Sequence, residues 1–141
     1  MATADIKDII MPSSWNEYIG TVLSDSGHVS RSAIYGISDS RKWASSVGFD
    51  VTSDEVRSLV VGFTDPSRLW KDGVYLGGRK YTCTRSESSL IVGRESAEGN
   101  GCVIFRCCKC LVIGTHEGEA HPGGCYSVVT KLGEYLKEHG I

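Results

Sequence analysis

The first strongly patterned stretch of the chain covers residues 13–27. Ser14 and Glu17 have the spacing of a capping box, in which two side chains satisfy the free backbone N–H groups at a helix start. Apolar side chains then recur at helical spacing, at Trp15, Tyr18, Ile19, Val22 and Leu23. The pattern predicts a short amphipathic helix that ends near Gly27.

The residues before this helix show weak patterning and end in Pro12. We interpret residues 1–12 as a flexible N-terminal extension. The remaining chain, residues 13–141, has the length of a single-core domain, for which about 100–150 residues is usual. We therefore expect one domain after the extension.

The central part of the chain has the pattern of strands joined by short turns. "SAIYGIS" and "KWASSV" flank the turn-like "SDSR" and predict a hairpin. Thr52 and Glu55 form a second capping box and predict a short helix over "VRSLVVGF". From residue 66 onward, apolar runs between glycine-containing turns predict strands at "RLW", "VYL", "RKYTCTR", "SLIVGRE", "CVIFRC" and "CLVIGTH".

Helical spacing returns near the C-terminus. Apolar residues recur at Val128, Val129, Leu132, Tyr135 and Leu136, and Gly140 stands where helices commonly end. Helices that bracket a run of strands, rather than alternating with them, favour the α+β class. We expect an antiparallel sheet with the terminal helices lying on it.

Composition narrows the class of protein. The 141 residues are 40% apolar and 23% charged, as in a globular domain. No apolar run approaches the roughly 20 residues that cross a bilayer, and the N-terminus lacks the pattern of a secretory signal. We expect a cytoplasmic protein. The net charge of −2 gives no broad attraction for phosphate backbones, so we expect no nucleic-acid partner.

The six cysteines are expected to be free thiols, because a cytoplasmic chain rarely keeps disulfides. Cys107, Cys108 and Cys110 lie close together, but the second cysteine pair of a zinc site is missing. His116 and His121 would complete a ligand set only if the fold brought them there. We expect no metal and no cofactor, and we interpret the three cysteines as small, partly buried strand residues.

The sequence predicts no enzyme. His121 and Cys125 have a spacing that could pair a base with a nucleophile, but no nucleophile motif and no orienting third group accompany them. The glycine-containing turns match neither GxxxxGK[ST] nor GxGxxG, so we expect no nucleotide site.

The aromatic residues of the two terminal helices form a candidate binding surface. Trp15, Tyr18, Leu132 and Tyr135 would lie together if both helices packed on the same face of the sheet. Rigid rings with N–H and O–H donors suit a polyproline II ligand, whose carbonyls accept hydrogen bonds. An ordinary aromatic core explains the same spacing. The pattern alone leaves both interpretations open.

Three segments resemble the profilin family and occur in the family's order: "SSWNEYIG", "LGGRKY", and "HPGG" leading into "VVTKLGEYLKEHGI". The resemblance covers residues 13–141. It implies an α+β fold with a central antiparallel sheet, the N- and C-terminal helices packed on one face and short helices on the other. It also implies a cytoplasmic, cytoskeleton-associated monomer that binds actin monomers and proline-rich segments and so regulates actin polymerisation.

The resemblance also implies two binding surfaces by position. The polyproline groove would be formed by Trp15, Tyr18, Trp43, Leu132 and Tyr135. The actin-binding surface would comprise Trp70, Lys71, Lys80, Thr82, Arg85, Arg94, His121, Gly123 and Tyr126. Alternation along a strand places Lys80 and Thr82 on one face and Arg85 on the other, unless a bulge intervenes.

The implied partners are monomeric actin and proline-rich proteins such as actin elongation factors, with phosphoinositide headgroups as a further candidate. A lipid-binding patch would use Lys71, Arg79, Lys80, Arg85 and Arg94, although basic residues exposed for solubility explain the same pattern. The alternative function is a profilin-like scaffold or sensor that does not bind actin. The aromatic residues Trp15, Tyr18 and Trp43 count against that alternative.

Overall fold

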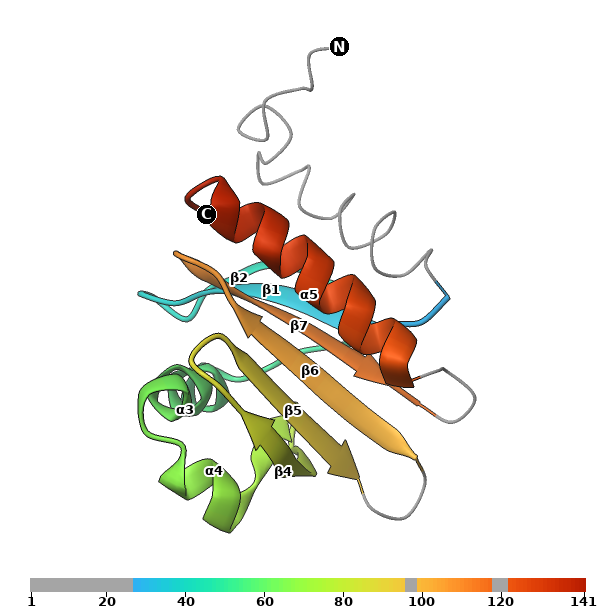
Figure 1. The fold of residues 1–141 in the computed structure, drawn as a ribbon. Helices are drawn as coiled ribbons and strands as arrows, with labels where there is room; N and C mark the ends of the chain where they lie inside the picture. Colours follow the sequence, from blue (N-terminus) through green and yellow to red (C-terminus); the bar gives the residue numbers. More distant parts are fainter. Residues whose placement is uncertain (1–26, 96–98, 118–121) are drawn as a thin grey trace.

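The computed structural model describes residues 27–95, 99–117 and 122–141 (Figure 1). The expected N-terminal extension and the helix predicted over residues 13–27 therefore lie almost wholly outside the described residues. The described elements are β1 (Arg31–Gly36), β2 (Lys42–Ser45), α3 (Ser53–Thr64), α4 (Ser67–Asp72), β3 (Val74–Leu76), β4 (Arg79–Ser86), β5 (Leu90–Glu95), β6 (Asn100–Arg106), β7 (Cys110–His116) and α5 (Pro122–Glu138).

The strands form one antiparallel sheet in the order β2-β1-β7-β6-β5-β4-β3. Strands β3 to β7 follow one another as a meander, and β1 then pairs with β7, so the first strand lies beside the last. The sequence predictions of the first hairpin, the meander and the C-terminal helix are confirmed. Together they give the expected α+β fold.

The strand predicted at "RLW" is wrong, because these residues lie in helix α4. Pro66 occupies the N-cap position, and Gly73 ends the helix with a φ of 94° that favours glycine. A three-residue apolar run has too few positions to separate a strand from a short helix by periodicity. Here the flanking proline and glycine were the better indicators.

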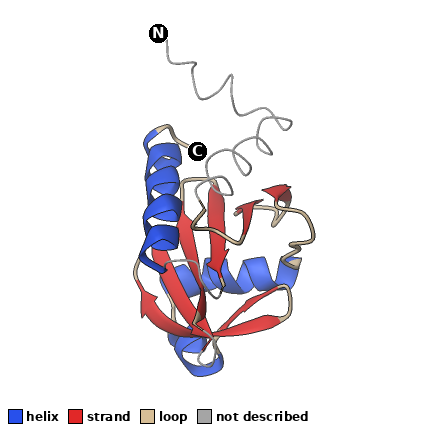
Figure 2. Ribbon diagram, turned by 90° about the vertical axis from the view of Figure 1, so that its right-hand side faces the viewer, coloured by secondary structure: helices blue, strands red, loops and turns tan. Residues whose placement is uncertain are grey.

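The helices lie on both faces of the sheet (Figure 2). Helix α5 packs along β6 and β7, and its side chains join one core that contains Val103, Phe105 and Leu136. Helices α3 and α4 cover the other face, where a second core contains Ile104 and Leu59. Adjacent residues of β6 thus enter opposite cores, which explains why this strand is apolar at nearly every position.

Two glycines let α5 approach the sheet closely. A Cβ atom on Gly133 of α5 would lie 2.2 Å from the ring of Phe105, and one on Gly114 of β7 would lie 2.5 Å from the side chain of Val129. Contacts this short do not occur between real side chains. The helix axis is therefore held near the sheet by the absence of side chains at these two positions.

The predicted capping box of α3 is present and also anchors a distant turn. Thr52 Oγ1 accepts a hydrogen bond from the N–H of Glu55, and Glu55 Oε1 accepts one from the N–H of Thr52. The same carboxylate accepts the N–H groups of Gly77 and Gly78, both at 2.8 Å. One side chain thus joins the start of α3 to the β3–β4 turn.

These contacts predict that the two capping residues differ in their contribution to stability. Thr52→Ala removes one cap and should lower the free energy of unfolding by about 1 kcal/mol. Glu55→Ala also releases two turn amides and should cost more, about 2 kcal/mol or above. Urea denaturation of both variants beside the unchanged protein measures the difference. Equal losses would show that the contact with the turn contributes nothing.

Candidate functional site

Part of the α5-facing side of the sheet is not covered by the helix. Helix α5 packs on β6 and β7, whereas the outer strands β4 and β5 extend beyond it (Figure 1). Tyr81 and Cys83 of β4 enter the core on the α3 side, so the side chain between them, Thr82, lies on the α5 side. Thr82 pairs with Arg94 of β5, and both are exposed. We call this area, which Lys80, Thr82, Arg85 and Arg94 line, the open sheet face.

A bulge in β4 places Arg85 on the open sheet face. The register passes from Cys83 opposite Gly93 to Arg85 opposite Val92, which leaves Thr84 as the extra residue. An extra residue reverses the alternation of all later side chains. Arg85 therefore lies on the same face as Lys80 and Thr82. Simple alternation along the strand would have placed it on the other face, and the bulge accounts for the difference.

The open sheet face is continuous with the first turns of α5. The guanidinium carbon of Arg85 lies 5.5 Å from the centre of the Tyr126 ring, within the range of a cation–π contact. Tyr126 is half-buried and packs against the α5-side core. Arg85 of β4 and Tyr126 of α5, which were both predicted for the actin-binding surface, are therefore neighbours.

A buried histidine lies in the same cross-strand row as Thr82 and Arg94. Gly101 of β6 pairs with Arg94 on one side and with His116 of β7 on the other. A Cβ atom on Gly101 would lie 2.5 Å from the His116 ring, so the imidazole covers the glycine. His116 is 3% exposed, and its Nδ1 atom has no hydrogen-bond partner among the described residues.

Some basic side chains near this surface are paired and others are free for a partner. Arg79 makes a two-pronged ion pair with Glu95, with both N–O distances at 3.0 Å, and Arg85 pairs with Glu87. Lys80 and Arg94 make no ion pair with any carboxylate in the described part of the chain. These two side chains contribute the unneutralised positive charge of the open sheet face.

The open sheet face also contains residues that the sequence prediction missed. A hollow of about 430 Å³ is lined by Thr82, Thr84, Arg94, Glu95 and Gly99. Val92, half-buried, lies opposite Arg85 and two positions from Arg94. The alternation of Leu90, Val92 and Arg94 along β5 would have indicated Val92, but Thr84 depends on the bulge.

The other residues predicted for this surface lie at its two ends or outside the described residues. Trp70 is 53% exposed on α4, and Lys71 beside it is also exposed; the helix itself packs against β4. His121 lies outside the described residues. Gly123 belongs to the first turn of α5. The structure thus brings the strand residues and Tyr126 together and places Trp70 and Lys71 on the adjoining helix.

The predicted groove residues are only partly described, since Trp15 and Tyr18 lie outside the described residues. Trp43 of β2 is half-buried against the α5-side core, with its indole nitrogen 3.0 Å from the position of a Cβ atom on Gly36. Leu132 of α5 is 4% exposed and belongs to that core. Tyr135, one turn further on, is 37% exposed, and its ring centre lies 4.5 Å from that of His139.

The amino-acid sequence of the chain matches a known protein family. The family model described as Profilin matches residues 13–141. The chain belongs to the profilin family. It is 32% identical over 127 residues to Profilin-1 of Dictyostelium discoideum, which covers 90% of this chain and 98% of the relative.

Solved structures of profilins share the fold. The crystal structure of Acanthamoeba castellanii profilin II superposes with a TM-score of 0.85 at 30% identity, covering 91% of this chain and all of that one. Mouse profilin IIa, solved in complex with a double repeat from the FH1 domain of mDia1, has a TM-score of 0.75 at 22% identity and covers 90% of this chain and 99% of its own. The profilin fold therefore holds across this range of identity.

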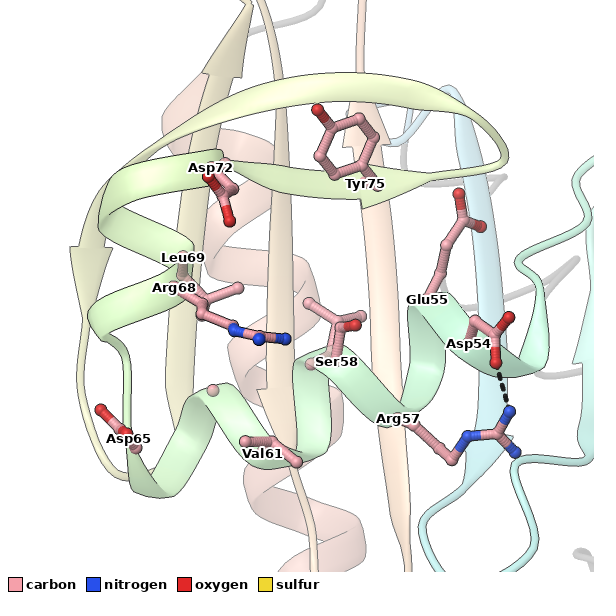
Figure 3. A pocket seen from close by; sticks show the side chains of 13 residues that line it. Asp54, Glu55, Arg57, Ser58, Val61, Asp65, Arg68, Leu69, Asp72 and Tyr75 are labelled. Carbon is pink, nitrogen blue, oxygen red and sulfur yellow. Dashed lines mark hydrogen bonds and ion pairs between the residues drawn. The ribbon is translucent and has the colours of Figure 1, made fainter.

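A second hollow, of about 570 Å³, lies between α3, α4 and β3 (Figure 3). Its lining includes the buried side chains of Leu59 and Leu69, and Arg68 extends across it from α4. Arg57 at its rim is paired with Asp54. No residue predicted for either binding surface lines this hollow, which is separate from the open sheet face.

The described residues bear on the metal cluster and on the cysteine nucleophile that the sequence raised as alternatives. In residues 27–95, 99–117 and 122–141, no three His, Cys, Asp or Glu side chains come together as a metal site would need. Burial raises the pKa of Cys125 to about 12, so its thiol stays protonated near neutral pH and is a poor nucleophile.

None of the described helices has the length and apolar character needed to span a bilayer.

The buried histidine predicts a pH dependence of stability. Burial and, second, the nearby charge of Arg94 lower the pKa of His116 below its ordinary value. The unfolded chain takes up a proton near pH 6.5, whereas folded His116 stays neutral to lower pH. Its contribution to stability is therefore fully present above that pH and is lost as the pH falls.

The test compares His116→Gln with the unchanged protein by urea denaturation between about pH 7 and pH 5, the range in which histidine titrates. We expect the variant to lose less stability on acidification, because glutamine does not titrate. Identical pH slopes would show that His116 is not the responsible group.

Proposed function

We propose that this member of the profilin family binds monomeric actin through the open sheet face, the end of α4 and the start of α5. The observation that carries the proposal is the cross-strand pair of Thr82 and Arg94 beside the Arg85–Tyr126 contact. The β4 bulge brings these residues onto one uncovered surface, and they are the positions that the family resemblance implies for actin binding. The uncompensated charge of Lys80 and Arg94 suits an acidic patch on the partner.

The proline-binding surface is proposed at Trp15, Tyr18, Trp43, Leu132 and Tyr135. Trp43 and Tyr135 support it because each large aromatic side chain keeps part of its surface exposed near α5. The FH1 complex of mouse profilin IIa shows that a protein of this fold binds such a segment. A groove that contacts a few residues buries well under about 1,200 Å², so we expect weak, roughly micromolar or poorer binding.

Two separate surfaces would permit actin and a proline-rich segment to bind at the same time. A proline-rich elongation factor would then hold actin at a high effective concentration by tethering, without new contacts to actin. The protein would act by delivery of subunits to growing filaments and would need no catalysis.

A phosphoinositide role has weaker support. Of the five basic residues of the candidate patch, Arg79 is paired with Glu95 and Arg85 with Glu87. Clusters of about 4 to 8 free basic residues are typical of lipid recognition. We therefore treat actin and proline-rich segments as the main partners.

Charge reversal tests the actin surface. Lys80→Glu combined with Arg94→Glu should weaken the affinity for purified monomeric actin at least about tenfold, because like charges would face each other across the interface. The matched control is Arg41→Glu, which reverses an exposed charge in the β1–β2 loop at the far end of the sheet. Sedimentation velocity or fluorescence titration measures each affinity. Equal binding by both variants would contradict the proposed surface.

A second experiment tests the proline groove. Trp15→Ala should abolish the change in tryptophan fluorescence on titration with a proline decamer while leaving actin affinity within a few-fold. Loss of both activities would indicate a folding defect. An unchanged proline affinity would indicate that Trp15 is a core residue and that this profilin lacks the proposed groove.

A further inference from the structure

Two cysteines face each other across the turn that joins β6 and β7. Cys107 follows the last residue of β6 and Cys110 is the first residue of β7, with Cys108 and Lys109 between them. The N–H of Cys107 donates a hydrogen bond to the carbonyl oxygen of Cys110 at 2.8 Å, directly beyond the Arg106–Leu111 pair. Both side chains enter the α5-side core, so both sulfur atoms lie on the same face of the hairpin.

This arrangement brings the two cysteines within the backbone separation of a disulfide. Opposed residues joined by a backbone hydrogen bond in an antiparallel pair have Cα atoms about 5.5 Å apart, within the roughly 4.4–6.8 Å that a disulfide spans. Both thiols are buried in the same core. The pair therefore needs no movement of a distant element to become linked.

The turn itself is easily opened. The two-residue turns that match strand twist need a positive φ at their first or both central residues. Ser40 is the one non-glycine residue with positive φ in the described part of the chain, so neither Cys108 nor Lys109 meets this need. Both are exposed. Local opening of such a hairpin end costs far less than global unfolding and gives solvent access to both buried thiols.

The β6–β7 turn also contacts the second half of α5 and the C-terminus. Cys107 Sγ donates to the carbonyl oxygen of Gly133 at 3.4 Å, and Cys108 Sγ to that of Lys137 at 3.6 Å. The N–H of Lys109 donates to the carbonyl oxygen of Ile141. The turn thus holds the last turns of the helix, and a change in the cysteines would be transmitted there.

We propose that Cys107 and Cys110 are an oxidative modification site, at which hydrogen peroxide converts the two thiols into an intramolecular disulfide. One thiolate attacks the peroxide, the O–O bond breaks, and the sulfur becomes a sulfenic acid while hydroxide leaves and is protonated to water. The second thiolate attacks that sulfur, the S–S bond forms, and the S–O bond breaks to release a second water. Two thiols are oxidised by two electrons, and one peroxide is reduced to two waters.

Oxidation removes the S–H group with which Cys107 contacts Gly133, so the last turns of α5 should loosen. The rate should rise with pH, because the thiolate is the reacting form. The neighbouring Cys107 thiol and, second, burial raise the pKa of Cys110, which makes the pair slow at neutral pH and faster above it. The oxidation does not require bound actin or a proline-rich segment.

The experiment treats the full chain with hydrogen peroxide and counts thiols after denaturation. We expect the count to fall from six to four, with a mass loss of two hydrogen atoms and recovery with dithiothreitol. Peptide mapping should identify the Cys107–Cys110 link. Hydrogen exchange at the amides of residues 136–138 should become several-fold faster in the oxidised protein.

Matched variants locate the chemistry. Cys108→Ser should form the same disulfide at a similar rate, because this exposed thiol is not one of the pair. Cys110→Ser should keep its remaining thiols at the same peroxide dose. Retention of six thiols by the unchanged protein, under conditions that oxidise a short dithiol peptide, would overturn the proposal. A bridge to Cys108 would also overturn it, and unchanged exchange in α5 would refute the coupling to the helix.

Discussion

The double burial of the central strands constrains the rest of the structure. Strands β6 and β7 present apolar side chains to both faces, so each face must be covered by helices. Helix α5 covers one face and α3 with α4 the other. Because Gly133 and Gly114 bring α5 close to the sheet, the helix fits over β6 and β7 and leaves β4 and β5 uncovered on that side. The open sheet face is thus a consequence of how the core is closed.

The uncovered strands differ in chemistry from the covered ones. On the α5 side, the pair Thr82–Arg94 replaces the apolar pairs found under the helix, and Gly101 gives the ring of His116 room to pack beside Arg94. Arg79 joins Glu95 and Glu117, which ties β4 to β5 and to the end of β7. Ion pairs therefore hold the outer strands where apolar packing is thinner, while Lys80 and Arg94 keep their charge available to a partner.

Because α5 lies close to the sheet, the cysteines of the β6–β7 turn are in contact with the helix. A turn that lay in solvent would leave Cys107 and Cys110 as ordinary surface thiols. Here both thiols are buried in the α5-side core, and Cys107 contacts Gly133, one of the two glycines that set the helix position. A redox change at the turn would therefore act on the helix that borders both proposed binding surfaces.

The sequence by itself determined most of the described elements and their order, with helix α4 as the exception. The capping box of Thr52 and Glu55, the glycine-punctuated meander and the C-terminal helical spacing all depend on residues a few positions apart, and so did the family resemblance. It did not determine the face on which Arg85 lies, the burial of Leu132, the place of His116 beside Arg94, or the contact between Cys107 and Gly133. Only the tertiary structure decided these, because each depends on strand register, on a bulge, or on the distance between a helix and a sheet. Those quantities are set by pairing between residues far apart in the chain, and local periodicity carries no information about them.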